Sequence, residues 1–250
     1  MTISATTSTM STMKRAVRTA AIAAAAVIAV AACSSSQTSA ATSSTTGSPA
    51  SAAPGSGGAA GTATYRLHMD FFSHESKLST VIDPQVFQAS AGAAAGPGPQ
   101  GISHAAGVAP TPKDAPAATT LLGADGTALN VSLGQWEKAA GTVAFSCVAG
   151  SEQAISQLSG LIPAGSYSTF VVHLDVQGKG RFTPWGDASG STDNFTASAS
   201  GTASVTNSVS GCLTSREAAV IIWHSDGRPH GATPGVLGVT WHNSLITPLP

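Results

Sequence analysis

The thiol of Cys33 is the side chain whose surroundings in the sequence point most directly to a chemical reaction. Three cations, Lys14, Arg15 and Arg18, and an apolar run over residues 20–30 precede it, and small residues stand directly before it. Small side chains suit a peptidase that admits nothing larger, and a thiol is the group that takes diacylglycerol. The apolar run is about half the ~20 residues of a spanning helix, so a cleaved signal is favoured over a retained anchor. This layout is typical of a bacterial lipoprotein, and a plain secretory signal with an incidental cysteine is the alternative.

The predicted lipoprotein signal peptide covers residues 1–32, and residues 33–63 then form a segment made almost wholly of Ser, Ala, Thr, Gly and Pro. Such a composition cannot bury enough apolar surface to offset chain entropy, so we expect a lipid-anchored flexible linker. Removing the signal lowers Lys+Arg from 11 to 8 against 12 Asp+Glu, which argues against nucleic acid as a partner. We expect an extracytoplasmic protein held at the bacterial cell membrane, with the bilayer as its partner through acylated, palmitate-bearing Cys33.

Cys147 and Cys212 are the two thiols that are left once Cys33 is assigned to lipid. Two cysteines in an oxidising compartment most often pair, so a disulfide is predicted. The bridge would close a loop of roughly 65 residues and contribute ~4 kcal/mol in the chain-entropy model. Two buried free thiols are the alternative.

Among the histidines, His224 and His230 are notable because they flank a turn-rich loop that contains Asp226. Imidazole and carboxylate groups grouped in this way can bind Cu(II) or Zn. His68 and His74, each near a carboxylate, fit a solvated strand face or, less well, a second metal site. The alternative for all of them is that lone histidines on strands are more often hydrogen-bonded structural residues.

The patterns of other catalytic classes are not found. The sequence has no Gly-x-Ser-x-Gly elbow, no Ser-x-x-Lys with its supporting motifs, no His-Glu-x-x-His and no phosphate-binding Gly-x-x-x-x-Gly-Lys. No catalytic residue is therefore predicted. A carbohydrate platform would have Trp185, in a loop, as its aromatic anchor, because Trp223 and Trp241 lie in apolar strand runs and are expected in the core. His242 is expected to pack beside Trp241 at the edge of the fold.

Short segments in which apolar and polar residues alternate recur along the chain, as strands with one buried side require. Strands are expected at residues 65–71, 129–133, 143–147, 166–174, 194–199, 203–209, 218–224 and 238–246. Gly, Pro, Asn or Asp fill nearly every gap between them. These signals predict one all-β domain over residues 64–250, either a Greek-key sandwich or a flattened barrel.

The stretch at residues 89–118 breaks this rhythm, because it is rich in Ala, Gly and Pro and has no periodicity. We expect a long exposed loop between an N-terminal strand pair and the main sandwich. Alternatively, it is a second linker that leaves residues 64–88 as a loosely attached appendage.

Three stretches of the C-terminal half carry a likeness to a known family. They are residues 160–165 with Phe170-Val171-Val172-His173, residues 193–205, and residues 220–226 followed by Pro234-Gly235 and Gly238. Together with Gly141-Thr142-Val143 they cover roughly residues 128–247 in the family's order. They resemble the copper/zinc superoxide dismutase fold family, including the related chordin-like (CHRD) domains. The resemblance implies a Greek-key, immunoglobulin-like sandwich.

The resemblance also implies a set of metal ligands, which this chain carries in part. The family's copper strand presents His-x-His, because residues i and i+2 lie on one strand face. Here Val171 stands at the first position and His173 at the second, while His224 matches the late copper ligand. The family's zinc loop would lie between His173 and Asp193, an interval that holds no histidine. With His230 from the following loop, His173 and His224 are the candidate metal ligands.

The incomplete ligand set favours a membrane-tethered extracytoplasmic lipoprotein with a non-catalytic, superoxide-dismutase-like β-sandwich. We expect it to act as a binding or structural module of the cell envelope, without a cofactor and with an unidentified protein or small-molecule ligand. Two alternatives stay open. One is a copper-only superoxide dismutase-like enzyme in which His230 or His242 replaces the missing ligand, and the other is an extracytoplasmic copper- or zinc-binding protein.

Overall fold

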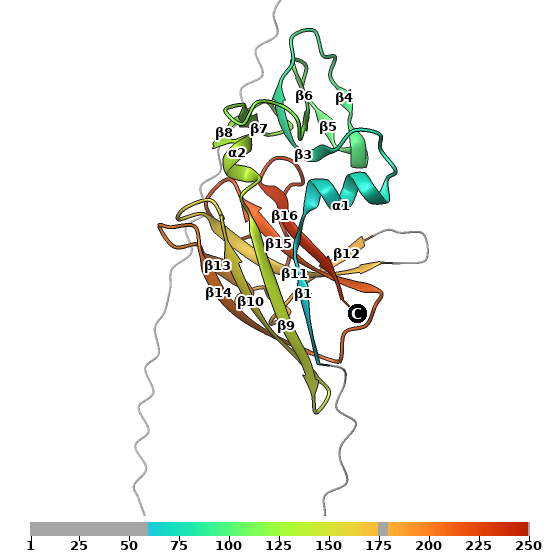
Figure 1. The fold of residues 1–250 in the computed structure, drawn as a ribbon, viewed down its shortest axis with the longest axis vertical. Coiled ribbons are helices and arrows are strands. Elements are labelled where there is room, and N and C mark those ends of the chain that lie inside the picture. The colour runs from blue at the N-terminus through green and yellow to red at the C-terminus, as the bar shows by residue number, and fades with distance from the viewer. Residues whose placement is uncertain (1–59, 175–179, 250) are drawn as a thin grey trace, which may run out of the picture. The chain divides into compact units, whose positions relative to one another are not determined.

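The structure is a computed structural model, and it describes residues 60–174 and 180–249. The predicted signal peptide, Cys33 and all but the last residues of the predicted linker lie outside the described residues. Within these residues the chain consists mainly of antiparallel strands (Figure 1). The prediction of an all-β fold is confirmed.

The first sheet has four strands in the order β1-β9-β10-β14. They are β1 (Gly61–Thr64), β9 (Ala140–Val148), β10 (Ser151–Ser159) and β14 (Ala203–Ser210). On β9 the predicted alternation is present, because Val143, Phe145 and Cys147 are buried and the residues between them are more exposed. This sheet therefore has one inner and one outer face.

The second sheet has the order β12-β11-β15-β16-β2, with β13 also paired to β11. Its strands are β12 (Gly180–Pro184), β11 (Ser166–Leu174), β15 (Glu217–His224), β16 (Trp241–Pro248), β2 (Arg66–Leu67) and β13 (Asn194–Thr196). On β15, Ile221 and Trp223 enter the main core, whereas Val220 and Ile222 belong to a second apolar cluster on the outer face. A strand that is buried on both faces reads as a continuous apolar run, which explains residues 218–223.

The two sheets pack face to face around the main core. Tyr167 and Val171 of β11 and Leu245 of β16 meet Phe145 of β9 and Leu158 of β10 in one cluster of buried side chains. The strand order of each sheet is open at both ends within the described residues, so the fold is a sandwich and not a closed barrel. The chain crosses from one sheet to the other between β1 and β2, between β10 and β11, between β13 and β14, and between β14 and β15.

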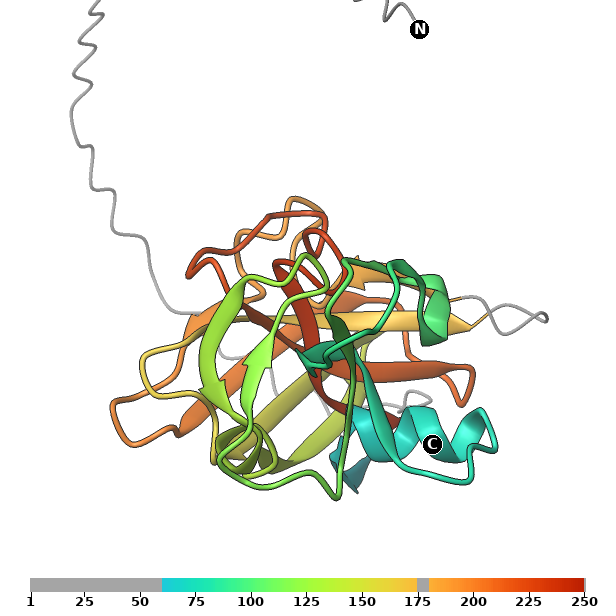
Figure 2. The ribbon, with the colours of Figure 1, turned by 90° about the horizontal axis from the view of Figure 1, so that it is seen from above.

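A third sheet covers one end of the sandwich, as the views from the side and from above show (Figures 1 and 2). Its order is β6-β3-β7-β8, with β3 (Ile82–Ala89), β6 (Val108–Pro112), β7 (Thr120–Leu122) and β8 (Ala128–Ser132). Beside it lie a two-stranded ribbon of β4 (Gly96–Pro97) and β5 (Ser103–His104) and the short 3-10 helix η1 (Pro99–Gly101).

The third sheet corrects the prediction of an exposed loop at residues 89–118. This stretch pairs with β3 through β6, and its Ile102 and Val108 pack with Phe87 in a separate apolar cluster. The strands were hidden because they are short and rich in proline. Proline is tolerated on an edge strand, where no ladder partner needs its missing N–H, and β6 is the edge of this sheet.

The helix α1 (His68–Glu75) corrects a second prediction, because a single strand was expected over residues 65–71. Alternating apolar residues suggested a strand, yet Met69 is buried in the main core and the Ser73 hydroxyl accepts a hydrogen bond of 3.0 Å from the backbone N–H of Ile82. Tertiary contacts of this kind override a short periodic pattern. Since Tyr65 and Met69 both lie in the main core, residues 64–88 are not a loosely attached appendage.

The strand predicted at residues 166–174 is present with the same bounds, and the other predicted strands are present with shifted ends. The strands that were not predicted are β1, β3, β4, β5, β6, β7, β10 and β12. The strand expected at residues 129–133 ends at Ser132, which caps the short helix α2 (Leu133–Trp136) by accepting a hydrogen bond of 3.3 Å from the backbone N–H of Gln135. Nowhere in the described part of the chain is a helix both long and apolar enough to span a membrane.

A disulfide joins Cys147 to Cys212, as predicted, with the two Cα atoms 5.4 Å apart. It links the end of β9 in the first sheet to the segment that leads into β15 of the second sheet. Cys212 stands two residues after β14, so the bridge joins the ends of two strands of the first sheet, β9 and β14, that lie on either side of β10.

Candidate functional site

His224 and His230 come together where β15 ends. The His224 side chain is buried and its Nε2 is hydrogen-bonded to the Ser168 hydroxyl at 2.8 Å, whereas its Nδ1 has no hydrogen-bond partner among the described residues. The two imidazole rings are 5.3 Å apart between centroids, and His230 Nε2 lies 3.2 Å from the Asp226 carboxylate. Burial, together with the nearby His230, lowers the pKa of His224 to about 4. The His224 ring is therefore neutral at pH 7.

His173 lies at the opposite end of the same strand pair. In the antiparallel ladder His173 faces Glu217, the first residue of β15, whereas His224 is its last residue and faces Ser166. Seven strand positions at about 3.3 Å each place the two histidines roughly 23 Å apart. The His173 ring is held instead by Glu217 at 3.1 Å and by the Thr183 hydroxyl at 2.8 Å. The prediction that His173 joins His224 and His230 in one site is wrong.

His242 lies inside the molecule, between the sandwich and the third sheet, and not at an edge as expected. Its Nδ1–H donates to the backbone carbonyl of Gln85 at 3.0 Å, and its ring centroid is 5.4 Å from that of Trp223 and 6.5 Å from that of Trp136. Burial lowers its pKa to about 4. These contacts give the ring a packing role, because both ring nitrogens face protein groups.

The donors present do not fit the copper and zinc set that the family resemblance implies. Over residues 60–174 and 180–249, no group of three or more His, Cys, Asp or Glu side chains is close enough to hold a metal ion. What the structure does bring together is the pair of imidazoles at His224 and His230 with the carboxylate of Asp226.

His68 and His74 both lie on α1 but in different environments. His74 is exposed and pairs with Glu75 at 3.0 Å, whereas His68 is buried and its Nδ1 has no hydrogen-bond partner in the part of the chain that the structure describes. Asp70 forms an ion pair with Lys113, whose Nζ is 2.7 Å from the carboxylate. The predicted solvated strand face of these residues is therefore wrong. Burial lowers the pKa of His68 to about 3, so this ring too is neutral at pH 7.

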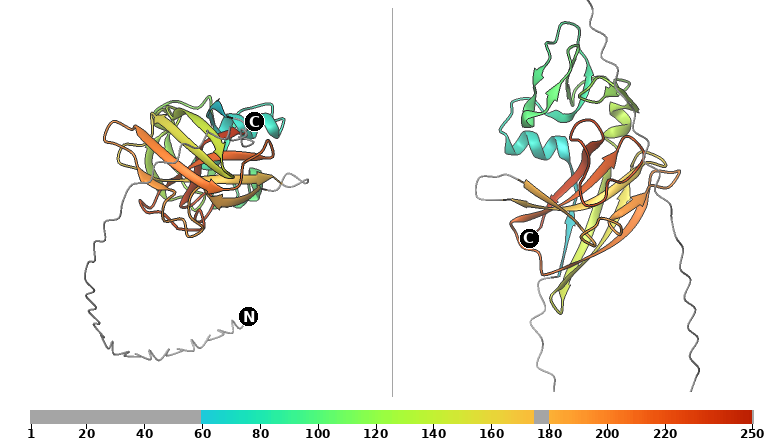
Figure 3. Two further views of the ribbon diagram at one scale, coloured as in Figure 1. Left: turned by 90° about the horizontal axis from the view of Figure 1, so that it is seen from below. Right: turned by 180° about the vertical axis from the view of Figure 1, so that it is seen from behind.

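A cavity of about 340 Å³ lies between α1 and the outer face of the second sheet. Among the described residues, its lining consists of aromatic, aliphatic and polar side chains from α1, from η1 and from four strands of the second sheet. These residues are His68, Phe71, Phe72, Glu75, Ser76, Gln100, Val172, Gly180, Phe182, Val220, Asn243 and Ile246. Sequence reasoning missed this cavity, although the doubly apolar run of β15 was a signal that its outer face is covered. Figure 3 shows α1 beside the second sheet, and Phe71 of α1 packs against the outer apolar cluster of that sheet.

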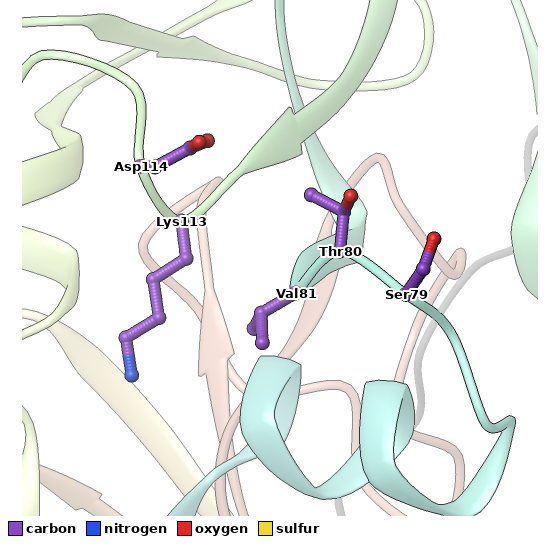
Figure 4. Close-up of a pocket in the computed structure, with 5 residues that line it drawn as sticks. All are labelled: Ser79, Thr80, Val81, Lys113 and Asp114. Carbon is purple, nitrogen blue, oxygen red and sulfur yellow. The ribbon is translucent and has the colours of Figure 1, made fainter.

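Two other pockets are more open to solvent. One, of about 400 Å³, is lined by Ser79, Thr80, Val81, Lys113 and Asp114 (Figure 4). The only cation of this lining, Lys113, is already paired with a carboxylate. The other, of about 470 Å³, lies on the outer face of the first sheet, over β1, β9, β10 and β14.

A buried carboxylate, Asp83, was not foreseen, and it joins two structural elements. Asp83 is fully buried and accepts hydrogen bonds from the backbone N–H of Gln85 at 2.9 Å and from Trp136 Nε1 at 2.8 Å, which ties β3 to α2.

Trp185, considered above as a loop-borne sugar-binding anchor, is instead fully buried in the main core. Its backbone carbonyl accepts a hydrogen bond from the amide of Asn207 at 2.8 Å. The carbohydrate platform therefore has no anchor at Trp185.

Comparison of the chain with protein-family models, with curated proteins and with solved structures finds no match in any of the three. The functional argument therefore rests on the residues and on the geometry described above. Two features bear on it: the pair of histidines at the end of β15 and the cavity beneath α1.

Proposed function

We propose that the protein is a lipid-anchored extracytoplasmic lipoprotein whose β-sandwich is a non-catalytic binding module of the cell envelope. The disulfide between Cys147 and Cys212 carries this proposal. Structural disulfides persist in oxidising compartments and are rare in the cytosol, so this bridge supports export. The motif that ends at Cys33 supports both export and a lipid anchor.

The contacts of the histidines support a binding role over catalysis. His173 is held by Glu217 and Thr183, and His242 is enclosed by two tryptophans and a backbone carbonyl. Side chains with such partners are fixed by packing and hydrogen bonds. From the resemblance to the superoxide dismutase family, this proposal takes only the fold and not the activity.

The lipid anchor is tested by the variant Cys33→Ala expressed from the full-length gene in a bacterium. We expect the natural chain to incorporate radiolabelled palmitate and to sediment with membranes, and the variant to lose both properties. The neighbouring variant Ser34→Ala is the matched control and keeps both. Equal labelling of natural chain and Cys33→Ala variant would show that the lipid is not on this thiol.

A second candidate function is copper or zinc binding, with a copper-only dismutase as its enzymatic form. The observation that favours it is the unpartnered, buried Nδ1 of His224 beside His230 and Asp226. Metal analysis of the purified protein separates the two candidates. Stoichiometric copper with superoxide dismutation, both lost in His224→Gln, would favour the metal protein over the binding module.

A further inference from the structure

The cavity between α1 and the second sheet has the size and lining of a binding site. We propose that it binds a small, neutral, mainly apolar molecule that carries a hydroxyl or carbonyl oxygen. This inference rests on the binding role proposed above and names the class of ligand. At about 340 Å³ the cavity lies within the range of roughly 300–1,000 Å³ that is usual for small-molecule sites.

The floor of the cavity is aliphatic and rigid. Val172, Val220 and Ile246 come from the neighbouring strands β11, β15 and β16 and belong to the apolar cluster on the outer face of the second sheet. Phe71 from α1 and Phe182 from β12 pack against the same cluster and form walls. Because these side chains stand on paired strands and a packed helix, a flat apolar ligand would find its contact surface already formed.

The polar end of the cavity is held by a chain of hydrogen bonds. Gln85 Oε1 accepts from the backbone N–H of Asn243 at 2.6 Å, and Gln85 Nε2 donates to Gln100 Oε1 at 3.0 Å. Asn243 Oδ1 in turn accepts from Trp241 Nε1 at 2.7 Å. Each of these side-chain oxygens, of Asn243 and of Gln100, already accepts one hydrogen bond. The amide N–H groups of the two side chains are donors that match a hydroxyl or carbonyl oxygen.

His68 adds a buried imidazole to this lining. Its side chain is 4% exposed, it lines the cavity, and its Nδ1 has no partner within the described residues. A buried polar atom without a partner is destabilising. The ring itself adds aromatic contact surface to the lining.

The charges of the lining disfavour an anionic ligand. The described lining contains the Glu75 carboxylate, and its one imidazole, His68, is neutral because burial lowers its pKa. An anionic ligand would meet the Glu75 carboxylate without a charged partner from the imidazole.

The test uses the purified full-length chain with Cys33→Ser, which cannot be acylated and leaves residues 60–249 unchanged. The probes are 2-naphthol, a neutral bicyclic molecule with one hydroxyl, and 2-naphthoate, the same ring with an anionic group. We expect saturable one-to-one binding of 2-naphthol in titration calorimetry and binding of 2-naphthoate that is at least about tenfold weaker. Equal affinity for both probes, or no saturation at millimolar 2-naphthol, would overturn the proposal.

Variants locate the site on the same chain. Ser76→Trp places a large ring at the mouth of the cavity and should weaken 2-naphthol binding by about tenfold, whereas His74→Trp, on an exposed position of α1, should change it less than about twofold. His68→Phe keeps an aromatic ring at this position and should weaken 2-naphthol binding. Its melting temperature should stay equal or rise, because an unpartnered buried nitrogen is removed. Unchanged binding in both Ser76→Trp and His68→Phe would place the probe elsewhere.

The result is separable from that of the lipid-anchor test. Loss of palmitate labelling in Cys33→Ala together with no binding of 2-naphthol would leave the lipoprotein proposal standing and reject the cavity ligand. Binding of 2-naphthol by a chain that takes no palmitate would reject the anchor and support the cavity.

Discussion

At the scale of single residues, the most consequential feature is the number of titratable side chains that are buried without a charged partner. His68, His224 and His242 are 4%, 1% and 0% exposed. Burial lowers the pKa of His68 to about 3 and of His224 and His242 to about 4. Two buried carboxyl groups, Asp83 and Asp193, shift the other way, because burial raises the pKa of each to about 6. All five groups therefore favour their neutral form in the folded state.

These shifts predict that the protein loses stability as the pH falls below 6.5. The unfolded chain takes up protons on its histidines first, so the contribution of the three neutral rings is complete above pH 6.5 and is lost toward pH 4. Asp83 and Asp193 oppose this, because the folded state takes up their protons first as the pH falls through about 6. The three histidines outweigh the two carboxyl groups, and we expect a net loss on the order of 1–3 kcal/mol between pH 7 and pH 5.

Urea unfolding at pH 7, 6 and 5 measures this loss. The variant His224→Gln cannot titrate at this position and should show a shallower decline, while His74→Gln, at an exposed position, should decline as the natural chain does. A free energy of unfolding that rises on acidification would contradict the assignment of neutral buried imidazoles.

At the scale of elements, the second sheet is the organising unit, because both of its faces are buried. Its inner face meets the first sheet in the main core, and its outer face carries a separate apolar cluster that α1 helps to cover. The disulfide adds a covalent link between β9 and the segment before β15. The packing of side chains from the two inner faces is what joins the two sheets.

Removing the disulfide should therefore destabilise the whole sandwich. We expect the double variant Cys147→Ala/Cys212→Ala to lose about 2–4 kcal/mol of unfolding free energy, since the unfolded chain is no longer constrained. Chemical denaturation measures the loss, and a reducing agent should produce it in the natural chain but not in the double variant. Cys33→Ala is the control, with unchanged stability. A double variant as stable as the natural chain would show that the bridge does not constrain folding.

At the scale of the whole molecule, the third sheet is part of the fold. It joins the sandwich through α2, through the hydrogen bond of Asp83 with Trp136, and through His242, which donates to Gln85. Within residues 89–118, the backbone N–H of Ala105 donates to Ala124 at 2.7 Å. The backbone of the segment that composition alone marks as loop is therefore hydrogen-bonded to the rest of the fold.

Hydrogen exchange tests this integration. We expect the amides of Ala105 and Lys113, which donate to Ala124 and Val81, to exchange roughly a hundredfold or more slowly than in an unfolded chain. The amides of β15 serve as the reference for full protection. Exchange of the whole segment at the unfolded rate would mean that residues 89–118 are a linker after all.

Several elements could be predicted from the sequence and one instructive strand could not. On β9, the residues that face the core are apolar, so the period of two was visible. On β10, the pattern is mixed, because the polar Ser156 and Glu152 are buried on the same face as Leu158, whereas Ile155 is 47% exposed. Ser156 is satisfied by the Tyr65 hydroxyl at 3.0 Å, and Glu152 accepts from a backbone N–H at 3.1 Å. Partners from distant segments allow polar residues to face inward, and no local pattern reveals them.

The candidate sites show the same division. His173 and His224 were grouped because the likeness of sequence suggested it, but the register of β11 against β15 places them at opposite ends of the ladder. His68 was read as part of an exposed strand face, but the helix turns it into a cavity.

By itself, the amino-acid sequence determined that the domain is built from strands and that Cys147 pairs with Cys212. Both follow from local or countable properties: alternation of side chains along an extended backbone, and two thiols that remain after one is assigned to lipid. Only the tertiary structure decided the helical state of residues 68–75, the folding of residues 89–118 and the separation of the histidines. These depend on which distant segments supply packing surface and hydrogen-bond partners, and such pairings are a property of the assembled chain.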